Sequence, residues 1–282
     1  MVIASILFAT ALATSAADAY SHANVTGDFD DFRRAEIAID AALAESSNPD
    51  LHLLKAEFEL TVHRLANAKR ELALLPDTPI VRRVRADVAM QEGRYREARH
   101  LLRGDDSWEA IARLADLERS DALYVRAQEE LNAKQMRAFA WIELQRGLLC
   151  LRKQRYEDAL AHYRRGELAQ PGWPALEEHI AEVLALLGRR EEAIAICKRL
   201  PQSYCALDDA AAERLFEHQH ALYPEAAIGH FIEYLLTKPA LDPRLVPFAE
   251  ENVRLRPNIE TKALLAKAYA KAYGLRRPQS PL

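Results

Sequence analysis

Nine histidines are the first residues of this chain that could support chemistry, as ligands of a metal ion. His179 precedes the carboxylate of Glu182 by three residues, which places the two side chains on nearby faces of a helix. His218 and His220 are two residues apart, so on a helix they point in different directions. Neither spacing is that of the HExxH zinc motif, and no third ligand is suitably spaced. The sequence therefore predicts solvated or packing histidines and no metal site.

Three cysteines could support redox chemistry or crosslinking. Cys197 and Cys205 are eight residues apart, at a predicted helix end and in the loop that follows, and could form a disulfide in an oxidising compartment. The alternative is that both are small hydrophobic residues. Cys150 lies in the middle of a predicted helix, on its apolar face, and is expected in the core. No CxxC or CxxCH motif indicates thioredoxin-like or c-haem chemistry.

Nucleophile and phosphate-binding motifs are missing from the sequence. There is no GxSxG, and nine glycines, most of them at predicted helix corners, provide no glycine-rich phosphate loop. Asp and Glu are abundant throughout and single out no catalytic pair. A formal net charge of −4 with interleaved signs offers no basic surface for nucleic acid. The sequence thus favours a protein that is not an enzyme and carries no cofactor.

The first nineteen residues are typical of an export signal. An apolar run over 2–13 is followed by small residues ending in Ala17-Asp18-Ala19, a small-x-small pattern for cleavage before Tyr20. No basic residue precedes the run, which departs from the usual signal. The alternatives are an uncleaved N-terminal anchor facing the periplasm and an ordinary buried helix. We expect a periplasmic or secreted protein whose mature chain has no stable membrane span.

A repeat of about thirty residues is the strongest signal in the chain. Segments such as 93–98, 154–159 and 188–193 share a turn residue, polar residues and a final alanine. Extending the pattern gives six alanines separated by 33, 30, 29, 32 and 34 residues: Ala35, Ala68, Ala98, Ala127, Ala159 and Ala193. With half of the residues hydrophobic and few glycines, the composition agrees with an all-α protein.

Each repeat is predicted to be a helical hairpin. In the clearest one, residues 141–153 carry a helical apolar stripe, Gln154 and Arg155 form the corner, and 156–169 form the second helix, which ends before Pro171. Gly147 and Ala159 are small enough to let the two helices approach closely. A single hairpin cannot cover its apolar face, so neighbouring hairpins must stack.

The pattern resembles the tetratricopeptide repeat family. With Ala159 aligned to the second-helix alanine of that family, signature positions are matched in the same unit and its neighbours by Gly147, Tyr156, Tyr163, Pro171, Gly188, Ala193, Ala86, Gly93, Tyr95 and Ala98. The resemblance is clearest over 80–200 and implies an α-solenoid, a right-handed superhelix whose concave face binds a protein or peptide. It looks like small exported bacterial repeat proteins.

After Cys205 the repeat weakens while helical periodicity continues. Helices are expected over 208–223, 224–236, 244–256 and 259–273, separated by a linker at 238–243. We interpret 207–275 as divergent repeats that complete the stack. The domain plan is a leader at 1–19, one repeat domain of about six to eight hairpins at 20–275 and a flexible tail at 276–282.

In the tetratricopeptide family the first helix of each hairpin lines the concave face. Carried over to the matching units, this selects as groove residues Arg83, Asp87, Gln91, Trp141, Gln145, Arg152, Glu178 and Glu182. An aromatic side chain among mixed charges suits an extended peptide or a helix. The alternative for Trp141 is a place in the core.

These observations favour a non-catalytic scaffold that binds a protein or peptide segment in the cell envelope. A first alternative is an accessory repeat subunit of an envelope enzyme or assembly machine whose chemistry lies on another chain. A weaker alternative is metal or small-molecule binding through His218, His220 and His230.

Overall fold

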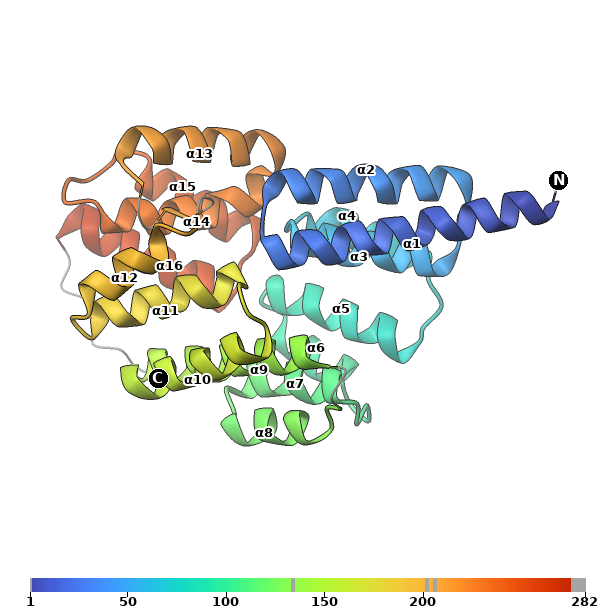
Figure 1. Cartoon of the computed structure of the whole chain (residues 1–282), viewed down its shortest axis with the longest axis horizontal. Helices are drawn as coiled ribbons and strands as arrows, with labels where there is room; N and C mark the ends of the chain where they lie inside the picture. Colours follow the sequence, from blue (N-terminus) through green and yellow to red (C-terminus); the bar gives the residue numbers. More distant parts are fainter. Residues whose placement is uncertain (1, 133–134, 201–202, 205–206, 275–282) are drawn as a thin grey trace. The chain divides into compact units, whose positions relative to one another are not determined.

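The computed structural model describes residues 2–132, 135–200, 203–204 and 207–274, with the backbone alone for 2–11. Within these residues there are sixteen α-helices and no β-strand. Consecutive helices pack against one another along the chain (Figure 1). The all-α prediction is therefore confirmed, as is the packing of helix on neighbouring helix that a helical repeat requires.

The described residues form two compact units. Unit 1 comprises residues 2–20, 29–98 and 207–274, and unit 2 comprises the described residues of 21–28 and 99–206. Helices α1 (Val2–Thr26) and α6 (Tyr95–Leu101) contribute residues to both. The other helices of unit 1 are α2 (Phe29–Glu45), α3 (Pro49–Thr61), α4 (Leu65–Ala73), α5 (Pro79–Gln91), α13 (Asp209–Leu222), α14 (Pro224–Thr237), α15 (Leu245–Leu255) and α16 (Ile259–Tyr273).

Unit 2 contains the clearest hairpins of the chain. Its helices are α7 (Trp108–Glu118), α8 (Asp121–Glu129), α9 (Met136–Arg152), α10 (Tyr156–Ala169), α11 (Pro174–Leu186) and α12 (Arg190–Cys197). The pairs α7/α8, α9/α10 and α11/α12 pack as hairpins, and α10 also packs on α11 (Figure 1). The predicted corner at 154–155 and second helix at 156–169 coincide with the observed ones. The first helix begins earlier, at Met136.

The six repeat alanines all lie in the interior. Ala35, Ala68, Ala98, Ala127 and Ala159 are fully buried and Ala193 is 6% exposed. A methyl group is small enough to let two helices cross closely in a densely packed interior, which explains why alanine recurs at this position. Gly147 of α9 acts similarly, because a Cβ there would lie 2.2 Å from the buried ring of Tyr163 in α10.

The hairpin corners share a left-handed residue. Positive φ angles occur five residues before four of the repeat alanines, at His63 (64°), Gly93 (71°), Gln154 (58°) and Gly188 (78°). In the short repeat the corresponding residue is Arg119 (51°), which caps α7. Glycine adopts this conformation freely, whereas other residues do so at a cost. The corner conformation is thus kept even where the glycine is not.

Helices α13–α16 form where the sequence predicts them. Asp208 caps α13 by accepting a hydrogen bond from the backbone N–H of Ala211 (2.7 Å), Pro224 opens α14, and Gly274 ends α16 with φ 63°. That 207–275 completes the stack of repeats stays a prediction. These helices share unit 1 with residues 29–98, and α13 contacts α2. Repeat spacing carries no information about such contacts between distant segments.

Helix α1 continues through the predicted cleavage point between Ala19 and Tyr20. The Tyr20 hydroxyl donates to the backbone carbonyl of Glu57 (3.1 Å), lies 2.6 Å from the Thr61 hydroxyl oxygen, and its ring meets Phe58 edge-on. The first residue of the expected mature chain is therefore held by α3. In the described part of the chain, no helix has both the length and the apolarity needed to cross a bilayer.

Candidate functional site

The predicted groove residues of unit 1 lie on α5 and are half-buried. Arg83 and Asp87 both have interaction partners within the protein. Gln91 accepts a hydrogen bond from the Nδ2 atom of Asn258, the N-cap residue of α16 (3.2 Å). Gln91 therefore contributes to the internal packing of unit 1, and a ligand that binds its side chain would have to displace Asn258.

The remaining groove residues lie in unit 2, on α9 and α11. Trp141 packs against the core cluster that contains Ile111 and Tyr124, as the alternative for this residue anticipates. Gln145 and Glu178 are half-buried, and Arg152 and Glu182 are exposed. Glu182 lies 3.2 Å from the Nδ1 atom of His179. Polar side chains thus remain reachable on these first helices, while the proposed aromatic anchor belongs partly to the core.

The cysteines occupy two environments. Cys150 is free and buried, as predicted. Arg155 donates a hydrogen bond to its Sγ atom (3.1 Å), and burial raises the pKa of the thiol. Cys197, at the end of α12, is disulfide-bonded. Cys205, its predicted partner, lies outside the described residues, so this pairing stays a prediction; residues 276–282 of the predicted tail also lie outside them.

The C-terminal histidines lie in different surroundings. His218 contacts the Asp30 carboxylate of α2 (3.1 Å), and the ring of His220 packs against Phe216 (5.1 Å between centroids). His230 lies close enough to His63 to influence its titration. Among the described residues no group of three or more His, Cys, Asp and Glu side chains is arranged to hold a metal ion.

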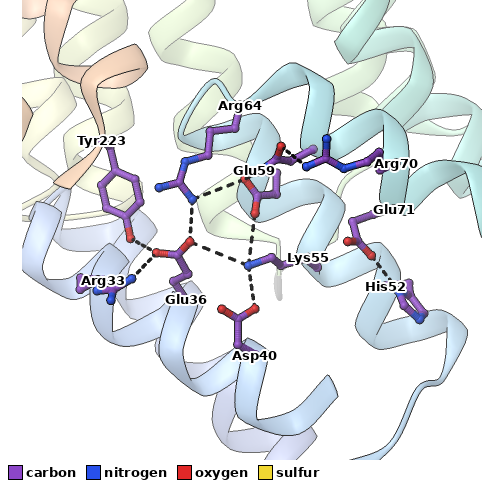
Figure 2. Close-up of polar contacts among 11 residues, drawn as sticks. Arg33, Glu36, Asp40, His52, Lys55, Glu59, Arg64, Arg70, Glu71 and Tyr223 are labelled. Atoms are coloured by element: carbon purple, nitrogen blue, oxygen red, sulfur yellow. Dashed lines mark hydrogen bonds and ion pairs between the residues drawn. The ribbon is translucent and has the colours of Figure 1, made fainter. Parts of the chain in front are cut away.

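Four charged side chains of unit 1 lie in contact: Glu36, Lys55, Glu59 and Arg64, which we call the α2–α4 charge cluster (Figure 2). Arg64 binds Glu36 (2.6 Å) and lies 3.7 Å from Glu59, while Lys55 binds Glu59 (3.2 Å). Three of the four side chains are almost completely buried. The cluster joins α2, α3 and the α3–α4 corner.

Neighbouring residues provide further hydrogen-bond and charge partners for this cluster. The Tyr223 hydroxyl donates to Glu36 (3.0 Å), its ring lies under the Arg64 guanidinium (4.9 Å), and Asp40 accepts from Lys55 (2.8 Å). Tyr223 comes from the junction of α13 and α14. The cluster therefore also ties the C-terminal helices of unit 1 to its N-terminal ones.

Burial and pairing act in opposite directions on these groups. Burial alone would raise the pKa of Glu36, but the hydrogen bond and charge of Arg64, together with the hydrogen bonds of Tyr223 and Arg33, outweigh it and lower the pKa. Burial would lower the pKa of Lys55, and the contacts with Asp40 and Glu59 raise it instead. Both groups therefore stay charged near neutral pH. A nucleophilic lysine or a general-acid glutamate needs the opposite shift.

Unit 2 also contains a buried carboxylate, Glu143 of α9, which is 1% exposed. It accepts hydrogen bonds from Gln128 (2.7 Å), His162 (2.8 Å), Arg165 (2.9 Å) and Arg146 (3.2 Å). Burial favours the protonated form, yet the His162, Gln128 and Arg165 contacts prevail and lower the pKa of Glu143 to about 2. Glu143 is a fixed anion that joins α8, α9 and α10.

Sequence reasoning missed both clusters. Their members are spread over helices that the repeat pattern treats as equivalent, and Asp and Glu occur throughout the chain. A charged residue at an otherwise apolar helix position is the available signal: Glu143 lies between Ile142 and Leu144, and Glu59 between Phe58 and Leu60. Such a residue predicts a buried charge with partners, but it does not identify them.

A cavity of about 550 Å³ lies in unit 1 between α1, α3 and the start of α5. Its apolar lining includes Ala13, Ala17, Leu51, Leu54 and Ile80. None of the eight predicted groove residues lines it. Because Ala13 and Ala17 belong to the predicted leader, cleavage before Tyr20 would remove one wall.

No protein-family model matches this chain, and no curated protein matches it either. The resemblance to tetratricopeptide repeats thus depends on the residues of the chain itself. The buried repeat alanines and the left-handed corners agree with that resemblance. Membership of the family stays a proposal.

Proposed function

We propose that the protein is a non-catalytic scaffold of the tetratricopeptide type that binds a protein or peptide segment on the first helices of its hairpins. The observation that carries the proposal is the pairing of consecutive helices as hairpins around buried alanines. Such hairpins present rigid rows of polar side chains, so a ligand meets a preformed surface.

In unit 2 the proposed ligand contacts are Gln145, Arg152, Glu178 and Glu182. These side chains carry both signs of charge and are exposed or half-buried. Trp141 would support them from the edge of the core. A right-handed superhelical course of the hairpins belongs to this proposal, as it does in the family that the chain resembles.

The buried charges support binding over catalysis. Glu36, Lys55 and Glu143 hold their charges through close partners, and those charges fix helices to one another. None of these three groups has the pKa shift toward neutrality that a proton-transfer residue requires. The rival proposal of an accessory subunit uses the same surface and differs only in the partner.

Export is the second part of the proposal. It is supported by the apolar run at 2–13, the small-x-small pattern before Tyr20 and the disulfide at Cys197. Structural disulfides persist in oxidising compartments and are rare in the cytosol. The periplasm or the medium is therefore the expected location.

Photocrosslinking in the native host tests the binding surface. A photoreactive amino acid at Gln145 or Glu182 is compared with one at Glu157, an exposed residue of the second helix α10. We expect a discrete partner from the first two positions and none from Glu157. Identical products from all three positions, or none, would contradict the proposed surface. Trp141 is avoided because it packs on the core.

A further inference from the structure

His63 and Arg256 form a close contact inside unit 1. The Nη1 atom of Arg256 lies 2.6 Å from the Nε2 atom of His63. A guanidinium has only donors, so His63 Nε2 must be the acceptor and the proton of the neutral ring must sit on Nδ1. The contact therefore exists only while His63 is uncharged.

The surroundings of this pair hold little compensating charge. The Nη2 atom of Arg256 donates to Asn252 (2.9 Å), and in the described chain Arg256 makes no ion pair with a carboxylate. Two buried polar atoms beside the contact have no hydrogen-bond partner: Arg256 Nε and Asn252 Nδ2. Buried donors in such a state weaken the packing that contains them.

Titratable groups on two neighbouring helices act on the pair at longer range. Helix α14 contributes His230 and Glu233, and α16 contributes Glu260. Next to His63 at its own corner, Arg64 is already engaged by Glu36 and Glu59. Glu233 and Glu260 act on Arg256 at longer range and do not overcome its burial, which lowers its pKa to about 10.

The contact joins segments that are distant in sequence. His63 forms the α3–α4 corner, and Arg256 ends α15. Beside it, the backbone N–H of Ile259 donates to the Tyr95 hydroxyl (2.7 Å), and a Cβ on Gly93 would lie 2.5 Å from the carbonyl oxygen of Pro257. Residues 252–259 thus rest on two N-terminal hairpin corners.

We propose that the His63–Arg256 contact is a proton-operated latch, which holds residues 252–259 on the α3–α4 corner while His63 is neutral and releases them when His63 gains a proton. Protonation removes the acceptor and places two cations in contact, and among the described residues no carboxylate forms an ion pair with either side chain. Helices α15 and α16 would then loosen from the N-terminal hairpins of unit 1.

The direction of the pH effect follows from the pKa of His63. Burial lowers this pKa well below its ordinary value, the charges of Arg256 and His230 add to the shift, and the Leu60 carbonyl opposes it. A histidine with a lowered pKa takes up its proton more readily in the open state. The latch is therefore fully closed above about pH 6.5 and weakens as the pH falls below it.

Hydrogen exchange with mass spectrometry tests the latch in the full chain. Between about pH 7.5 and about pH 5, and after correction for intrinsic rates, we expect exchange in 60–65 and 252–259 to rise about tenfold or more. His63→Asn should abolish the rise, because asparagine tolerates a positive φ, accepts from Arg256 and cannot become charged. His100→Asn, at an exposed position of α6, is the matched control and should behave as wild type.

An equal rise in wild type and His63→Asn would overturn the latch, as would no rise in wild type. The NMR titration of the His63 ring in the unmodified protein gives a second test that needs no variant. An NMR pKa at or above about 6.5 would show that the ring does not resist protonation in the closed state. Neither result would bear on ligand binding by unit 2.

Discussion

Single side chains determine how closely the helices of a hairpin approach. Gly147 and Tyr163 form a matched pair in which the absence of a Cβ on α9 makes room for a fully buried ring on α10. Glu143 forms the opposite kind of contact, a buried charge surrounded by four donors. Both contacts predict large effects from very small substitutions.

Gly147→Ala should lower the free energy of unfolding by about 1–3 kcal/mol, because the added methyl group overlaps the Tyr163 ring. The cost of this overlap exceeds the gain in helix propensity. Urea denaturation of the two proteins measures the loss. When Tyr163→Leu is already present, adding Gly147→Ala should lower the free energy of unfolding clearly less, since the ring that the methyl group overlaps has been removed. An unchanged or higher stability of the single variant would contradict this packing.

Glu143→Gln should lower the free energy of unfolding by about 3–5 kcal/mol near neutral pH, because Arg146 and Arg165 lose their buried counter-charge. The pKa of Glu143 is lowered to about 2, so its contribution is present above about pH 4.5 and is lost as the pH falls toward 2. Denaturation at several pH values should show the gap between variant and wild type closing on acidification. Glu157→Gln, at an exposed position, is the control.

At the scale of the elements, hairpin geometry is the part of the fold that the sequence predicts best. The periodicity locates α10, α13, α14 and α16 to within a residue, because caps, prolines and apolar spacing all act locally. The left-handed conformation of His63, at a corner position that glycine usually occupies, was not predicted, because the φ angle is known only from the backbone structure. The partners of buried charges were missed for a similar reason: they come from other helices.

The end of α12 carries a prediction of its own. A Cys197–Cys205 bond closes a short loop and should stabilise unit 2 by about 2–3 kcal/mol. Alkylation of the unfolded, non-reduced protein should label Cys150 alone, the one thiol that is free and buried among the described cysteines. Reduction should expose the other two and lower the melting temperature. Labelling of three cysteines without reductant would contradict the bond.

For the whole molecule, the composition of unit 1 matters most. It combines residues 29–98 with residues 207–274, and the contacts between them include Tyr223 with Glu36 and Asn258 with Gln91. A solenoid built strictly in sequence order would contact only along neighbouring repeats. The sequence could not reveal this arrangement, because each hairpin presents a similar apolar face to any partner.

Truncation distinguishes the two arrangements. Removing residues 207–282 should lower the protection of 29–98, which loses its contacts with Tyr223 and Asn258 but keeps a core cluster around Leu72 and Val84. Residues 99–206 should stay protected, because their core clusters around Tyr163 and Ile142 lie wholly within that segment. Hydrogen exchange of the truncated protein would map which segment loses protection. Co-expression of 207–282 as a separate chain should restore protection of 29–98. Full protection of 29–98 without the C-terminal helices would show that they are dispensable.

Because unit 1 combines N-terminal and C-terminal segments, its parts are synthesised at different times. A nascent chain emerges from the N-terminus onward, so the residues of unit 2 are all available before α13 has been synthesised. Helices α3–α5 can form their own core cluster around Leu72 and Val84, but the surface of α2 and α3 that packs on Tyr223 stays uncovered until α13 and α14 have been synthesised. We therefore expect this stretch to be the client of holding chaperones during synthesis, with its release timed by the arrival of the carboxyl-terminal helices.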